Sequence, residues 1–205
     1  MNIPFFWEQV QQGAANSSWL ELIAVLFGLA SVVYAMKEKI LVYPTGIVNV
    51  LIYVYICAQY KLYADMAINA YYFAMSIYGW ALWGKQPRQT SLAITYSSGK
   101  ERFLSILLTL LSFVIIYFVL SSFTDSDVPV WDAVTTSFFV VAMVLMAKKK
   151  MEHWIGWILG DLISVPLYIY KGLAFTAVQY LVFTGLAVMG YMMWKKTVAE
   201  RGLEK

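Results

Sequence analysis

Charged residues are scarce in this sequence. Only 13% of its 205 residues are charged, whereas 61% are hydrophobic and the mean hydropathy is +0.66. Soluble domains carry about 25% charged residues, so this chain cannot cover a soluble surface and is predicted to be an integral membrane protein. Its single cysteine, Cys57, excludes an internal disulfide framework, and one cysteine with one histidine cannot build a transition-metal centre.

Signatures of enzymes are also missing. The sequence contains no phosphate-binding loop of the GxxxxGK[ST] type, so nucleotide hydrolysis is not expected. An intramembrane aspartyl protease is an alternative, because Asp65 and Asp161 faintly resemble its two aspartate motifs, but Ile158 stands where that motif needs glycine. We therefore predict that the protein is not an enzyme and has no cofactor, metal or nucleic-acid partner.

Long apolar runs fill most of the chain, each near the length of about 20 residues that crosses a bilayer as a helix. They lie at 19–36, 40–60, 62–84, 103–123, 130–147, 154–170 and 172–194. Residues 1–18 contain no Lys or Arg and fit an interfacial helix or a frayed terminus rather than a signal peptide. Residues 1–205 are thus predicted to be one all-α membrane domain of seven transmembrane helices.

The distribution of basic residues predicts the orientation. With seven crossings, only Lys61 and Lys171 of the 15 basic residues fall on the side of the N-terminus, and the other thirteen fall opposite. Basic loops stay in the cytoplasm. The chain is therefore predicted to be a multi-pass protein with its N-terminus outside and its C-terminus inside.

The sequence also carries an internal repeat. Shifting the chain by 111 residues aligns the first three spans with the last three, and Gly79 then falls on Gly190 and Trp83 on Trp194. The intervening span reverses direction, so both triplets run the same way. This predicts a parallel 3+1+3 repeat related to the sugar-facilitator (SWEET-like) fold, with bundles at 19–84 and 130–194 and a linker helix at 103–123. Such repeats bind their substrate near mid-membrane, between the halves.

Asp161 lies deep inside the sixth span. A carboxylate at the centre of a membrane helix costs about 2.5–3.5 kcal/mol, so it should face a cavity or a partner. Trp154, Trp157 and Asp161 are spaced i, i+3, i+7 and should share one helix face. Two indoles and a carboxylate predict a cage for a flat cationic ligand, held by cation–π attraction and charge balance.

Other polar residues at membrane depth extend this candidate site. Asn49 lies one position from the repeat image of Asp161, Asn69 and Tyr72 share a face of the third span, and Gln179 and Tyr180 lie on the seventh. These groups suit hydrogen bonds to a polar ligand, although interhelical hydrogen bonding would explain some of them equally well.

Several motifs together resemble the Pnu family of bacterial vitamin transporters, over about residues 19–200. They are Lys61-Leu62-Tyr63-Ala64-Asp65, Tyr78-Gly79-Trp80 with Trp83, Val130-Trp131-Asp132, Trp154-x-x-Trp157 and Gly190-x-x-x-Trp194. The resemblance implies a homotrimer of seven-helix protomers in the bacterial cytoplasmic membrane. It also implies facilitated diffusion of a vitamin that a cytoplasmic kinase then phosphorylates and traps, with Trp154 and Trp157 in the family's WxxW substrate motif.

The substrate expected from this resemblance is a cationic heteroaromatic vitamin. Asp161 stands where the nicotinamide riboside branch, PnuC, typically carries Asn, and resembles the thiamine branch, PnuT. We therefore expect thiamine first and nicotinamide riboside as the alternative. A sugar facilitator, a proton-coupled vitamin carrier or a structural membrane subunit are more remote interpretations.

Overall fold

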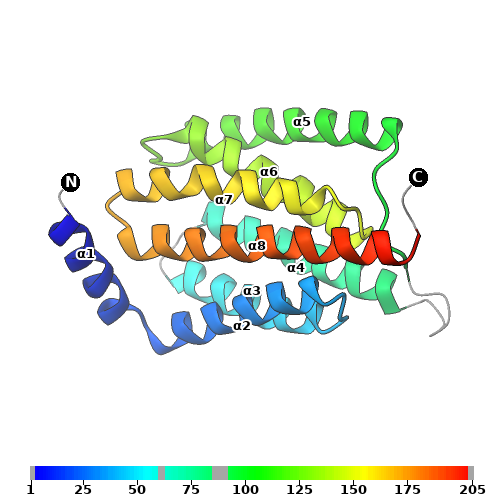
Figure 1. Cartoon of the computed structure of the whole chain (residues 1–205). Helices are drawn as coiled ribbons and strands as arrows, with labels where there is room; N and C mark the ends of the chain where they lie inside the picture. The colour runs from blue at the N-terminus through cyan, green and yellow to red at the C-terminus, as the bar shows by residue number, and fades with distance from the viewer. Residues whose placement is uncertain (1–2, 60–62, 85–91, 203–205) are drawn as a thin grey trace.

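The computed structural model describes residues 3–59, 63–84 and 92–202, and these form a bundle of α-helices (Figure 1). The helices in this part of the chain are α1 Ile3–Asn16, α2 Trp19–Met36, α3 Val42–Gln59, α4 Tyr63–Gly84, α5 Gly99–Phe123, α6 Pro129–Ala147, α7 His153–Tyr170 and α8 Ala174–Glu200. The prediction of an all-helical membrane protein is confirmed. Residues 3–16, for which a frayed terminus was the alternative, are helical.

Two helix ends differ from the prediction by more than two residues. α5 begins at Gly99 rather than 103, because Ser98 and Glu101 form a capping box in which each side chain accepts a hydrogen bond from the other's backbone N–H. α8 continues to Glu200 rather than stopping at 194. Hydropathy marks only the apolar part of a helix. It therefore missed the charged first turn of α5 and the charged last turns of α8.

Five helices are long and apolar enough to cross a membrane by length and composition: α2, α3, α5, α6 and α8. The two other helices predicted to cross are α4 and α7, and α7 carries the buried Asp161. α4 and α7 also hold much of the candidate site. Their lower apolar content therefore follows from the polar residues on them.

The repeat is visible in the backbone. Between α2 and α3 the amide of Lys39 donates to Tyr34, and between α6 and α7 the amide of Lys150 donates to Leu145, both at 2.9 Å. Glu38 and Lys149, which are 111 residues apart, both adopt the left-handed conformation, with φ of 52° and 50°. The two turns, 37–41 and 148–152, therefore share one geometry at the offset found in the sequence.

Helix packing follows the same relation. α2 packs against α8 and α4 packs against α6, which are equivalent contacts if α2, α3 and α4 (the first triplet) correspond to α6, α7 and α8 (the second triplet). α5 lies along one edge against α6 and buries none of its residues, while α1 packs on α8 at the end of the bundle away from the C-terminus (Figure 1).

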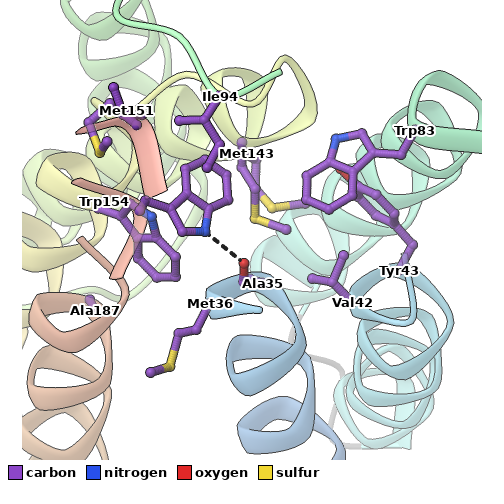
Figure 2. Packing of buried hydrophobic residues seen from close by; sticks show 13 residues of the cluster. Ala35, Met36, Val42, Tyr43, Trp83, Ile94, Met143, Met151, Trp154 and Ala187 are labelled. Carbon is purple, nitrogen blue, oxygen red and sulfur yellow. Dashed lines mark hydrogen bonds between the residues drawn. The ribbon is translucent and has the colours of Figure 1, made fainter. Parts of the chain in front are cut away.

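The main buried core lies beside the two equivalent turns, and we call it the turn-end cluster. It consists of Ala35, Met36, Val42, Tyr43, Trp83, Ile94, Met143, Met146, Met151, Trp154, Ala187, Trp194 and Val198. Figure 2 shows Tyr43 and Trp83 on one side of this cluster and Trp154 on the other, with Met143 and Ile94 between them. Both triplets contribute, so the cluster joins them at this end.

Candidate functional site

Asp161 is the buried acidic residue of the bundle interior, with only 4% of its surface exposed. Within the described residues, its carboxylate makes no hydrogen bond or ion pair. It lies close enough to Tyr72 of α4 and Tyr180 of α8 for its charge to act on both hydroxyls. A buried carboxylate is costly unless it is paired, so this position favours a ligand that brings positive charge.

A run of aromatic rings lies on the same helices. Phe139 of α6 stacks on Trp157 at 5.2 Å between ring centroids and on Tyr180 at 6.2 Å, with an angle of only 6° between the second pair. Tyr180 in turn contacts Tyr168, with 5.0 Å between the ring centroids. Phe139 is buried among these rings, whereas Trp157 and Tyr180 are only partly buried, so a heteroaromatic ring would stack on one of these two.

Hydrogen-bonding groups adjoin this run of rings. The side chain of Gln179 lies near the hydroxyl of Tyr53 of α3, and Tyr53 is close enough to Tyr168 for the two hydroxyls to interact electrostatically. The group therefore receives side chains from both triplets. It combines a carboxylate, aromatic faces and an amide, which can bind a cationic ring and the hydroxyls attached to it.

Close helix approach explains how the rings are held. A Cβ on Gly160 would collide with the ring of Phe139, so the absence of a side chain there lets α6 and α7 pack with Phe139 between them. The first triplet has the same contact with the sizes exchanged, because Asn49 of α3 packs on Gly28 of α2. Asn49 also donates to the Ala24 carbonyl at 2.6 Å. Its amide nitrogen therefore links two helices.

One predicted site residue lies elsewhere. Trp154 belongs to the turn-end cluster (Figure 2). Its ring centroid lies 4.4 Å from that of His153 and 5.6 Å from that of Trp194. The prediction that two indoles and Asp161 form one cage is therefore corrected in this structure, since the faces of Trp154 are taken up by other aromatic rings. Asn69 donates to the Asp65 carbonyl of its own helix, near the start of α4.

A match to known transporters accompanies this geometry. The family described as nicotinamide mononucleotide transporter matches residues 18–196, nearly the whole chain. The chain belongs to this family.

Individual relatives carry the names of vitamin transporters. The chain is 26% identical to the nicotinamide riboside transporter PnuC of Escherichia coli (strain K12), covering 93% of this chain and 90% of the relative. It is 22% identical to the riboflavin/roseoflavin transporter RibM of Streptomyces davaonensis, covering 86% and 84%. A crystal structure of the vitamin B3 transporter PnuC superposes with a TM-score of 0.73 and 26% identity, over 97% of this chain and 90% of that one.

These findings confirm the resemblance to the Pnu family and the class expected from the sequence, a multi-pass membrane transporter rather than an enzyme. They do not support thiamine as the first choice of substrate. The relatives reported above are named for nicotinamide riboside, vitamin B3 or riboflavin, which favours the alternative.

Sequence reasoning missed three residues that the structure adds to the site: Tyr53, Phe139 and Tyr168. Aromatic residues make up 17% of this chain, so a single Phe or Tyr in a span carries little signal. One signal for Phe139 was available, since it is the repeat image of Gly28, and a large residue opposite a glycine marks a change in the packing between repeats.

Proposed function

We propose that this member of the family transports nicotinamide riboside across the bacterial cytoplasmic membrane. The observation that carries the proposal is the buried, unpaired carboxylate of Asp161 beside Tyr72, Tyr180 and the stacked ring of Phe139. The pyridinium ring of nicotinamide riboside is flat and positively charged, so it matches the carboxylate and the ring faces. Its ribose offers hydroxyls to the Tyr53–Gln179 pair.

Charge separates the candidate ligands. Riboflavin has a neutral ring and would leave Asp161 without a counterion. Thiamine is cationic, but the named relatives give it no support. Nicotinamide mononucleotide adds a phosphate that the carboxylate of Asp161 would repel. We therefore expect the non-phosphorylated riboside to bind best.

Calorimetric titration of the purified protein with nicotinamide riboside, nicotinamide mononucleotide, riboflavin and thiamine tests this order. The riboside should bind at least about tenfold more tightly than the others, a difference of about 1.4 kcal/mol. Tighter binding of thiamine, of the mononucleotide or of riboflavin would contradict the proposal, and thiamine would agree with the first expectation from the sequence. No binding of any of the four would contradict it as well.

The proposed architecture is a single membrane domain of seven crossings in a parallel 3+1+3 repeat related to the sugar facilitators, with α5 as the linker. The matching turns at 37–41 and 148–152 and the paired contacts α2–α8 and α4–α6 support it. The substrate would sit between the triplets. The number of basic residues in the loops supports an outer N-terminus and an inner C-terminus.

The transport mode is proposed to be facilitated diffusion, with a cytoplasmic kinase that traps the vitamin. Uptake into vesicles should then be independent of a pH gradient, whereas a proton-coupled carrier would respond to one. A homotrimer is proposed from the family resemblance. The apolar side chains of α5, none of them buried within one chain, are available to lipid or to a second copy.

A further inference from the structure

Two tryptophans link the triplets by equivalent hydrogen bonds. The indole N–H of Trp83 in α4 donates to the carbonyl of Ala147 in α6 at 3.0 Å. The indole N–H of Trp194 in α8 donates to the carbonyl of Ala35 in α2, also at 3.0 Å, as the dashed line in Figure 2 marks. Each bond starts in one triplet and ends on the last turn of a helix in the other.

A buried ion pair lies beside these bonds. Glu38 and Lys149 occupy equivalent positions in the two turns, and their side chains meet at 3.2 Å. Lys149 is only 5% exposed, and its ammonium group lies 4.4 Å from the ring centre of Trp83. Arg201 also pairs with Glu38, at 3.0 Å. An ion pair between equivalent residues therefore holds the two turns together, at the point where the two triplets meet.

The segment 92–98 packs beside these contacts and is bonded to the turn 148–152. The amide of Thr95 donates to the Lys149 carbonyl, and the amide of Met151 donates back to Thr95. Glu152 accepts hydrogen bonds from the amide and hydroxyl of Ser97. This fixes the segment to the turn of the second triplet and inserts Ile94, which is fully buried, into the turn-end cluster (Figure 2).

The opposite end of the bundle is held differently. There Lys171, in the turn between α7 and α8, pairs with Asp132 of α6 at 2.7 Å. Both residues belong to the second triplet, so this ion pair does not join the two triplets. Within residues 3–59, 63–84 and 92–202, it is at the turn end that equivalent groups from both triplets meet.

We propose that the Glu38–Lys149 ion pair and the two reciprocal tryptophan hydrogen bonds form a gate at the turn end of the pathway, closed in this structure. A route between the triplets cannot open at this end while these contacts persist, so they must break together. This inference rests on the proposed transport function. The separation of the triplets at this end, which the contacts prevent, can be measured without any vitamin.

Cysteine labelling can measure that separation. In a Cys57→Ala background, Met143→Cys places a single thiol within the turn-end cluster. We expect slow reaction with a water-soluble maleimide while the gate is intact. Lys149→Gln should raise the rate at least about tenfold, which corresponds to about 1.4 kcal/mol in the equilibrium between closed and open forms. Trp194→Phe removes one reciprocal hydrogen bond and should act in the same direction.

Two further variants separate a gate from general loosening. The exchanged pair Glu38→Lys with Lys149→Glu restores opposite charges and should label more slowly than Lys149→Gln. Lys150→Gln is the matched control, because Lys150 pairs with Glu101 of α5 at 2.9 Å and not across the triplets; its labelling rate should equal that of the parent.

Unchanged labelling in folded Lys149→Gln would overturn the gate, and so would equal acceleration by Lys150→Gln. If Lys149→Gln does not fold, Trp194→Phe and Trp83→Phe test the gate instead. Unchanged labelling in both of these variants would also overturn the gate. None of these readouts depends on which vitamin binds, so failure of the gate and failure of the proposed substrate are distinguishable.

Discussion

The buried, unpaired carboxylate of Asp161 destabilises the folded protein. A cationic ligand that pairs with it removes part of this unfavourable free energy and therefore binds more tightly. Hydrogen bonds and close pairs to a charged group contribute about 1.5–3 kcal/mol, more than neutral ones. Asp161→Asn keeps the size of the side chain and removes its charge. The change therefore isolates the electrostatic part of binding.

We expect Asp161→Asn to weaken binding of nicotinamide riboside by about ten- to a hundredfold, from the energy of a pair with a charged group. The reduced riboside has an uncharged ring of nearly the same shape, and its affinity should change less than threefold, about 0.6 kcal/mol. Calorimetry with both ligands checks this. Asp65→Asn, the same substitution at an exposed residue of α4, should leave both affinities unchanged. Equal losses for the two ligands in Asp161→Asn would contradict a role for charge.

At the residue scale, the sequence predicts which side chains are anomalous but not which of them meet. Asp161, Tyr72 and Tyr180 were predicted and do lie together, because a carboxylate at membrane depth is informative wherever it occurs. Trp154 and Trp157 share the spacing of one helix face, but each ring contacts different helices. Helical periodicity gives the direction of a side chain, whereas its neighbours depend on tertiary packing.

Glycines determine how closely the helices approach in each triplet. Gly190 of α8 lies under the ring of Trp154, and Gly79 of α4 lies under the ring of Tyr43, so equivalent glycines support equivalent aromatic rings. A methyl group at either position would collide with ring atoms. Gly185, about one and a half turns earlier on α8, faces open space, because no atom of another described helix lies within 4 Å of the place a methyl group would take.

Gly190→Ala should lower the free energy of unfolding by about 1–3 kcal/mol, the usual effect of overpacking a core. Gly185→Ala is its control on the same helix and should be neutral or stabilising by up to about 1 kcal/mol, because Ala favours helix over Gly. Thermal unfolding of the purified variants in one detergent checks both. Equal stability of the two variants would show that α8 does not pack on Trp154 as described.

At the element scale, the sequence predicted most helix ends within a few residues, because charged and turn residues interrupt the apolar runs. The start of α5, which it missed, is set by a capping box of the kind that also begins α2. Ser18 with Glu21 and Ser98 with Glu101 form capping boxes at the starts of α2 and α5. The Ser-x-x-Glu pattern is readable in sequence, and applying it at 98–101 would have predicted the start of α5 correctly.

At the scale of the whole molecule, the proposed orientation places the two ends of α6 on opposite sides of the membrane. Asp127 follows α5 at one end, and Lys148 follows α6 at the other. With a cytoplasmic C-terminus, the two residues lie on opposite sides of the membrane, since α6 crosses between them.

In the Cys57→Ala background, Asp127→Cys should react with an impermeant maleimide added to intact cells. Lys148→Cys should react only after the membrane is made permeable. The two variants are matched because each exposes one thiol beside the same helix. Reaction of both from outside would contradict a crossing by α6, and the reverse pattern would contradict the proposed orientation.

At the scale of the whole chain, the repeat was the most informative sequence pattern. The offset of 111 residues found in the sequence reappears in turn geometry, in helix contacts and in the donors of the two tryptophan hydrogen bonds. Composition could not indicate that Phe139 and Asn49 occupy exchanged positions across that repeat. The sequence aligned to its own repeat shows that the residue types differ, but only the structure shows that the large residue packs on the small one in both triplets.

The Glu38–Lys149 pair has a consequence for how such a chain could have arisen. In an assembly of two identical half-length chains, a residue on the symmetry axis meets its own copy. Glutamate would then face glutamate and lysine would face lysine, and either pairing would repel. Opposite charges at this point require two independently variable copies of one position, which gene duplication provides. The ion pair would thus have become possible after duplication, and a half-length chain carrying only Glu38 or only Lys149 would meet a like charge if it paired with its own copy.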